Sequence, residues 1–253
     1  MAVNRRSELL GISYDVVTRA QILERVTTAM LGEHVSVLNH VNIHAMNLAW
    51  GDPEMTTILN HSDFVFVDGV GIRWGSICAG LGGQVGERST SRDFIEDLFE
   101  ICGERQLPVY HLGDTEDVNA DFTDKLSKEH PDCPLAGCHH GFFDQHGPEN
   151  DRLIELINNS GAKLLLLGMS MPVQEKWAWR NRERLRVPAV LSVGGLMRIY
   201  TGATARGPKW MTDNGMEWVF RLAVQRRLVW RRYVLGNPLF LWRCFCSRFK
   251  KPV

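Results

Sequence analysis

The chain has 253 residues, which suits one large domain or one domain with an appendage. Its composition is that of an ordinary globular protein, which excludes disordered and collagen-like classes. Its formal net charge is zero. The sequence shows no signal peptide and no run of about 18 apolar residues. The six cysteines form no CxxC pair and no zinc-ligand spacing, so we expect free thiols in a reducing cytoplasm.

The N-terminal segment predicts a short strand and turn, then a helix, then a second strand over residues 35–38. Asn39 follows that strand. It either hydrogen-bonds a sugar or a base, or only caps the helix expected over 43–50. We interpret His40 and His44 as surface or packing residues rather than metal ligands, because no acidic partner lies at ligand spacing.

The stretch from Asp63 to Ile72 is the most informative in the chain. Its unbroken apolar run, residues 64–67, predicts a strand buried on both faces, as in a parallel sheet. Asp68 then lies at the carboxyl end of the strand, where ligands bind in open α/β sheets. Gly69 and Gly71 let the backbone approach a ligand, and a helix beginning near Gly71 offers free N–H groups. The alternative is that Asp-Gly is only a turn.

The middle of the chain repeats the strand–helix pattern. A glycine-rich link over 80–86 is flexible enough to be a mobile loop, and a helix follows over 94–104. The run over 162–167 is the clearest buried strand, and it ends at Gly168. Pro172 suits the first turn of the next helix, so Gln174 and Glu175 would lie beside its free N–H groups. At that position the carboxylate of Glu175 either interacts favourably with the helix dipole or holds a ribose hydroxyl or a base edge.

Alternation from residue 35 to about 195 predicts an α/β fold, with a Rossmann-like, mainly parallel sheet and helices on both faces. We expect this domain to occupy residues 1–200. A helical basic-aromatic appendage would then occupy residues 201–253.

The appendage has a distinctive composition, with no Asp or Glu beyond Glu217. Its basic residues, interleaved with tryptophan, phenylalanine and tyrosine, are Arg221, Arg226, Arg227, Arg231, Arg232, Arg243, Arg248, Lys250 and Lys251. This pattern favours peripheral contact with an anionic membrane surface. Contacts to a pyrophosphate or partner, or packing on the body, are alternatives. Nucleic-acid binding is disfavoured because no such motif accompanies the charges.

Taken together, these motifs resemble the WecG/TagA/CpsF glycosyltransferase family. The matching residues, in order, are Asn39, Asp68, Gly69, Val70, Gly71, Glu87, Arg88, Asp93, Leu112, Gly113, Gly137, His140, Gly141, Phe142, Phe143, Gly168, Pro172, Gln174, Glu175, Val193, Gly194, Gly195, Gly202, Arg206, Pro208, Glu217, Trp218, Arg221, Arg231, Arg232 and Tyr233. Each motif is weak alone, but their order and spacing make the set specific.

The resemblance implies an inverting hexosyltransferase of exopolysaccharide, teichoic acid or capsule biosynthesis. It would use a UDP-sugar, often UDP-N-acetylmannosamine, and no metal or other cofactor. The acceptor would be a sugar on a polyprenyl diphosphate at the inner face of the plasma membrane. Departures from the family pattern are Val37, where a threonine is usual two residues before the matched asparagine, Ser91 in place of glycine, and Gly207 in place of alanine.

The resemblance also implies residue roles. Asp68 is the expected general base, and Asn39 would orient the acceptor or the base. The expected substrate-binding residues are Gly69, Gly71, Glu87, Arg88, Gly168, Gln174 and Glu175. Without a metal, the charge on UDP would need arginines, for which Arg206, Arg221, Arg231 and Arg232 are candidates.

Two rival functions remain open from the sequence. One is a nucleotide-dependent oxidoreductase on a Rossmann-like sheet, against which the missing GxGxxG counts. The other is a non-catalytic membrane-bound scaffold, for which Val37 is the only hint. Self-association is plausible from the apolar residues of the tail, and the sequence does not specify the donor sugar, the acceptor or the linkage.

Overall fold

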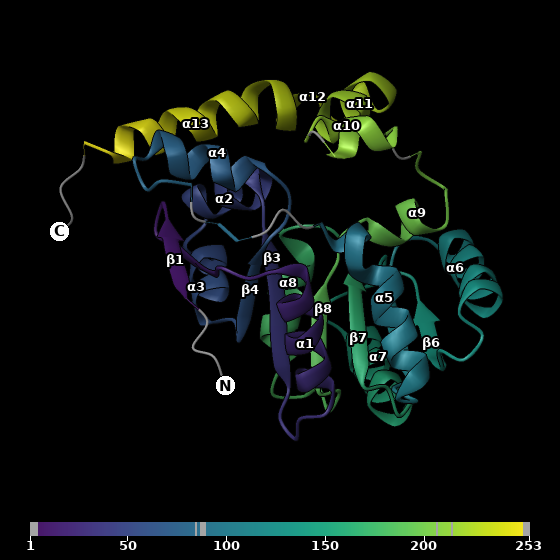
Figure 1. Ribbon diagram of the computed structural model, residues 1–253. Helices are drawn as coiled ribbons and strands as arrows, with labels where there is room; N and C mark the ends of the chain where they lie inside the picture. The colour runs from purple at the N-terminus through teal and green to yellow at the C-terminus, as the bar shows by residue number, and fades with distance from the viewer. Residues whose placement is uncertain (1–4, 84, 87–89, 206, 214, 250–253) are drawn as a thin grey trace.

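The structure, a computed structural model, describes residues 5–83, 85–86, 90–205, 207–213 and 215–249 (Figure 1). Three of the predicted site residues, Glu87, Arg88 and Arg206, lie outside these ranges. The described chain forms an α/β body, over one end of which the C-terminal helices lie.

The body is built on a six-stranded parallel sheet, which confirms the predicted fold class. The strands follow the order β4-β3-β8-β7-β5-β6. Their bounds are β3 (Ser36–Val41), β4 (Phe64–Val67), β5 (Val109–Gly113), β6 (Leu135–His139), β7 (Leu164–Gly168) and β8 (Ala189–Ser192). A separate antiparallel hairpin, β1 (Arg6–Leu9) with β2 (Ile12–Asp15), precedes them. Because all six strands run in one direction, their carboxyl ends share one edge.

Helices cover both faces of the sheet. Successive side chains of each strand point to opposite faces, and because both sets are apolar, both faces must be covered. In β7, Leu164 and Leu166 belong to one hydrophobic cluster, whereas Leu165 and Leu167 belong to another. The first face carries α1 (Arg19–Met30), α5 (Ser91–Glu104), α6 (Glu116–Glu129) and α9 (Leu196–Tyr200). The second carries α2 (Ile43–Gly51), α3 (Pro53–His61), α7 (Pro148–Asn159) and α8 (Val173–Asn181).

Two neighbouring strands explain where the polar residues of the site fall. The prediction for residues 64–67 is confirmed by β4, which is fully buried. β3, however, continues three residues beyond the predicted strand. Asn39 and His40 therefore lie inside β3, paired with Val65 and Phe66, instead of following its end.

The C-terminal segment is helical. It contains α10 (Lys209–Asp213), α11 (Glu217–Val224), α12 (Arg226–Trp230), the π-helix η1 (Arg231–Leu235) and α13 (Gly236–Ser247). α13 packs against α2 and against α4 (Gly71–Cys78), the helix that follows β4 (Figure 1). Within the described residues, no helix has both the length and the apolar character that crossing a membrane requires. The division at residue 200 stays a prediction.

The contact between α4 and α13 depends on one glycine. Phe240 and Cys244 of α13 are fully buried. A Cβ atom on Gly75 would lie 2.4 Å from Cζ of Phe240 and 3.0 Å from Sγ of Cys244. At the start of α13, Asn47 donates a hydrogen bond to the carbonyl oxygen of Gly236, and Arg243 donates one to Asn47. The appendage is thus held on the body by a close apolar contact and by two hydrogen bonds that involve the side chain of Asn47.

We expect Gly75→Val to destabilise the contact between α4 and α13 by about 1–3 kcal/mol, because an overpacked core must shift. Gly51→Val is the matched control, since a Cβ atom there meets no atom within 4 Å. Thermal unfolding, together with proteolysis of the 236–247 segment, measures the effect. Equal stability of the two variants would contradict the proposed close packing.

Candidate active site

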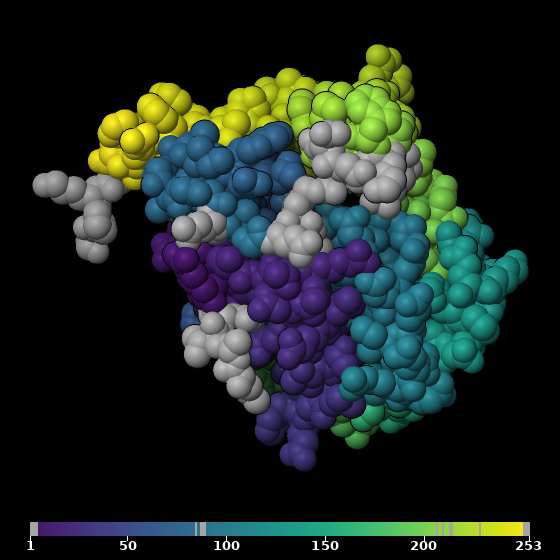
Figure 2. Space-filling view, in the orientation of Figure 1, coloured from purple at the N-terminus to yellow at the C-terminus, as the bar shows by residue number. Residues whose placement is uncertain are grey.

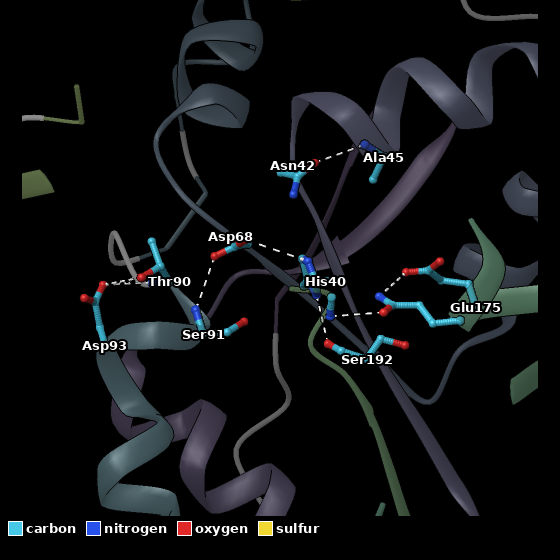
Figure 3. Close-up of polar contacts among 11 residues, drawn as sticks. His40, Asn42, Ala45, Asp68, Thr90, Ser91, Asp93, Glu175 and Ser192 are labelled. Carbon is cyan, nitrogen blue, oxygen red and sulfur yellow. Dashed lines mark hydrogen bonds and ion pairs between the residues drawn. The ribbon is translucent and has the colours of Figure 1, made fainter. Parts of the chain in front are cut away.

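Asp68 lies at the carboxyl edge of the sheet, directly after β4. Its backbone N–H donates to the carbonyl oxygen of Val41, 2.9 Å away, so it is the next residue of the β3–β4 ladder. Its Oδ1 accepts a hydrogen bond of 3.3 Å from the backbone N–H of Ser91, the first residue of α5 (Figure 3). A carboxylate at a helix N-terminus is favoured by the helix dipole and its free N–H groups. The side chain is 23% exposed, which leaves it open to a ligand.

The turn after Asp68 explains the two glycines that follow it. Gly69 has φ +87°, a left-handed conformation that favours glycine. Gly71 begins α4, and a Cβ atom there would lie 2.4 Å from Cγ1 of Ile43. Gly69 thus permits the turn, and Gly71 permits the start of α4 to approach the start of α2. The structure gives both glycines a backbone role close to Asp68.

His40 is the residue that sequence reasoning missed. It is 5% exposed, so of the two roles expected for it, surface residue or packing residue, the structure shows packing. Its Nδ1 lies 3.0 Å from the carbonyl oxygen of Ser192 in β8, and its Nε2 lies 3.8 Å from Oδ2 of Asp68 (Figure 3). The ring also contacts Phe66. His40 therefore bridges the candidate base and the neighbouring strand.

Asn39 does not join this group. It is fully buried and donates to Oγ of Ser62, which itself donates to the carbonyl oxygen of Ile58. The helix cap that we considered for Asn39 is made by Asn42, whose side chain accepts from the N–H of Ala45 (Figure 3). Asn42 lies at the sheet edge and is only partly buried. Its side chain is thus more accessible at the sheet edge than that of Asn39.

One of the predicted arginines, Arg232, approaches the acid from the appendage, and Arg221 lies near Arg232. Burial lowers the pKa of Arg232, the positive charge of Arg221 lowers it further, and the nearby Asp68 carboxylate opposes this change. Arg232 also acts on His44, whose pKa is lowered to about 4 by burial first and by that charge second. Arg231, in contrast, is exposed and lies over the ring of Trp230.

Gln174 and Glu175 form a buried pair in the first turn of α8. Oε1 of Gln174 accepts from the N–H of Gly194, and its Nε2 donates to Oε1 of Glu175, with distances of 3.0 and 2.8 Å. Burial raises the pKa of Glu175 to about 7, and the hydrogen bond from Gln174 opposes the rise. Both side chains are fully buried. They therefore support the loop after β8, close to the strand that anchors His40.

Gly168 ends β7 where it meets the end of β5. A Cβ atom on Gly168 would lie 2.7 Å from Nε2 of His111 and 3.2 Å from the carbonyl oxygen of Gly194. At the same edge, Nε of Arg198 donates to the buried carboxylate of Asp114. Among the described residues, no three His, Cys, Asp or Glu side chains form a group that could hold a metal ion. The edge thus offers an acid, cations and close backbone contacts.

Chemically, this arrangement suits proton abstraction beside an anionic group. Asp68 can accept a proton from a hydroxyl, and arginines can stabilise a phosphate that leaves with negative charge. The family model for "Glycosyl transferase WecG/TagA/CpsF family" matches residues 7–253. The chain belongs to this family. It is a glycosyltransferase, and the oxidoreductase alternative is thereby set aside.

Curated relatives of this glycosyltransferase come from Staphylococcus aureus. Those of strains MRSA252, NCTC 8325 / PS 47 and COL are each named N-acetylglucosaminyldiphosphoundecaprenol N-acetyl-beta-D-mannosaminyltransferase. Each is 23% identical over 250 residues, which cover 96% of this chain and 95% of the relative. The similarity thus extends through the appendage of the glycosyltransferase as well as its body.

The buried carboxyl of Glu175 should make the stability of the folded protein depend on pH. Its pKa of about 7 in the folded protein exceeds the ordinary 4.5, so the folded state binds more protons between these values. The free energy of unfolding of the wild type should therefore fall by about 3 kcal/mol as pH rises through this window. Glu175→Gln cannot ionise and should lose that dependence.

Urea unfolding at about pH 5 and about pH 8 measures the difference between wild type and variant. Glu155→Gln, on the exposed side of α7, is the control and should follow the wild type. If the stability of Glu175→Gln varies with pH as the wild type does, Glu175 is not the buried titrating group.

Proposed function

We propose that this glycosyltransferase transfers N-acetylmannosamine from UDP-N-acetylmannosamine to an N-acetylglucosaminyl diphosphoundecaprenol acceptor. The names of the S. aureus relatives support the sugar and the acceptor. The observation that carries the mechanism is Asp68, held at the sheet edge by Ser91 and influenced by Arg232. A UDP-linked donor agrees with the family resemblance and with arginines beside the acid.

The proposed reaction is a single inverting displacement. The acceptor hydroxyl attacks the anomeric carbon while Asp68 takes its proton. The bond from the anomeric carbon to the β-phosphate oxygen breaks, and its electron pair leaves with UDP. Arg232 and Arg221 would stabilise the charge that develops on the diphosphate, because a planar guanidinium matches phosphate oxygens. Arg206 stays a candidate for the same role.

Donor identity can be tested by thermal unfolding of the full chain with a panel of UDP-sugars, because a ligand that binds only the folded state raises its stability. UDP-N-acetylmannosamine should raise the unfolding temperature more than UDP alone or the UDP-linked N-acetylglucosamine epimer. Transfer to a lipid-linked N-acetylglucosamine diphosphate then confirms the reaction. A larger shift and faster transfer with another UDP-sugar would overturn the proposed donor.

Asp68→Asn should lower turnover by about 10²–10⁴-fold, because a positioned general base contributes about that much. UDP affinity, measured by calorimetry, should stay near that of the wild type, since the amide preserves the shape of the side chain. Asp124→Asn on the exposed face of α6 is the matched control. Near-normal turnover in Asp68→Asn would exclude Asp68 as the base.

The outer surface of α13 and α4 supports a membrane-facing orientation. Large apolar side chains are exposed there; Trp242 of α13 is 63% exposed, and Phe249, two residues after α13, is 71% exposed. The others are Trp74, Ile77, Leu239 and Phe245. Figure 2 shows α13, in yellow, lying along the outside of the body next to the blue α4 segment. Aromatic side chains of this kind favour the interface of a bilayer.

Arginines near this surface supply the matching charge. Arg226, Arg227 and Arg231 are exposed on α12 and η1, and Arg248 is exposed after α13. Arg226, Arg227 and Trp230 line a shallow pocket of about 290 Å³. We propose that this surface contacts anionic phospholipid at the inner face of the plasma membrane, where the acceptor diphosphate would reach Asp68. Self-association stays a prediction, and we assign no surface of the described residues to it.

The membrane contact is best tested on exposed side chains. Deleting 216–253 would also remove Phe240 and Cys244 from the core. Trp242→Glu combined with Phe245→Glu should reduce flotation with vesicles that contain phosphatidylglycerol and slow transfer to a lipid-linked acceptor. Leu156→Glu, on an exposed apolar residue of α7, is the control. Unchanged flotation of the double variant would refute the proposed contact.

A further inference from the structure

His40 is held on both sides by groups that leave little freedom for its ring. Its Nδ1 lies 3.0 Å from the carbonyl oxygen of Ser192, which can only accept a hydrogen bond. Nδ1 therefore carries the hydrogen. Phe66 packs against the ring, with centroids 5.8 Å apart, and the side chain is almost fully buried. The orientation of the ring is thus set by β8 and β4 together.

The remaining ring nitrogen faces the candidate base. Nε2 of His40 lies 3.8 Å from Oδ2 of Asp68, which is ion-pair range and longer than a hydrogen bond. With Nδ1 protonated, Nε2 is either a lone pair that repels the carboxylate or the N–H of an imidazolium that attracts it. Only the second form gives the carboxylate a donor. Catalytic contacts of this length commonly shorten around a substrate.

We propose that His40 is a positioning residue that holds the Asp68 carboxylate for proton abstraction. Ser91 N–H binds Oδ1 from the α5 side, and Nε2 of His40, which in the proposed imidazolium form is a donor, faces Oδ2 from the β3 side. Two donors on the two oxygens fix the plane of the carboxylate, while each oxygen keeps a lone pair for the acceptor hydroxyl. His40 keeps its own proton through the reaction. The proposal rests on the proposed role of Asp68 as base.

The arginines in this part of the site, Arg232 and Arg221, come from the appendage, and we have assigned them to the diphosphate. His44, beside Arg232, has its pKa lowered to about 4 by burial and by that charge, so it is neutral near pH 7. Within the described residues, His40 alone contacts both Asp68 and a backbone acceptor of the neighbouring strand.

The two nitrogens can be replaced separately. His40→Asn provides an amide N–H near Nδ1 for the Ser192 carbonyl but nothing at Nε2. His40→Gln extends an amide N–H to the position of Nε2. His40→Phe keeps the ring packing against Phe66 and removes both nitrogens. His61→Asn, at an exposed histidine whose ring pairs with a carbonyl oxygen of its own helix, is the control.

We expect His40→Asn and His40→Phe to lower kcat by about 10- to 100-fold, because a small misplacement of a reacting group costs about this much. The KM for the UDP-sugar should change little, and His40→Gln should recover most of the lost kcat. Steady-state kinetics with a lipid-linked acceptor measures both, and calorimetry checks that UDP binding is retained. Thermal unfolding checks that each variant is folded.

Three results would overturn the proposal. The first is a kcat of His40→Asn and His40→Phe within about twofold of the control while Asp68→Asn is inactive, which leaves the proposed function intact. The second is an equal loss in all three His40 variants, with a matching fall in thermal stability, which indicates packing alone. The third is an active Asp68→Asn, which removes the base itself and with it the proposed mechanism.

Discussion

The parallel pairing of β3 with β4 on one side and β8 on the other is the constraint on which the site depends. It brings Asp68 and the carbonyl oxygen of Ser192 to the same edge, with His40 of the central strand between them. Residues 40, 68 and 192 are far apart in the chain, and only the register joins them. A shift of one residue in β3 would turn His40 to the opposite face.

The second constraint is the packing of the appendage on α4. α4 begins three residues after Asp68, so whatever rests on α4 lies close to the acid. The absence of a Cβ atom on Gly75 lets Phe240 and Cys244 approach, and α13 in turn positions η1, which carries Arg232. The position of Arg232 on η1 thus depends on apolar contacts that the next helix, α13, makes with α4. The body and the C-terminal helices are therefore packed together next to Asp68 even though their compositions differ sharply.

The sequence predicted the local features well and the contacts between strands poorly. The run over 64–67 and Asp68 after it were readable because a fully buried strand has a distinctive pattern. The strand expected over 35–38 is shorter than β3 because Asn39 and His40 are polar, and polar residues inside a parallel strand are unusual. Asn39 is accommodated by Ser62, and His40 by Ser192, which is 152 positions away. Helix α3 was missed, although Asp52 and Pro53 form an ordinary helix start.

The buried polar residues around the edge follow from the same geometry. Gln174 links the N–H of Gly194 to Glu175, and Gly194 follows the strand whose last residue accepts from His40. These hydrogen bonds form a support that runs from α8 through β8 to β3, beside Asp68. A carboxyl buried as deeply as Glu175 is costly to ionise. Burial raises the pKa of Glu175 to about 7, so near neutral pH this support carries less negative charge beside the site than an ordinary carboxylate would give it.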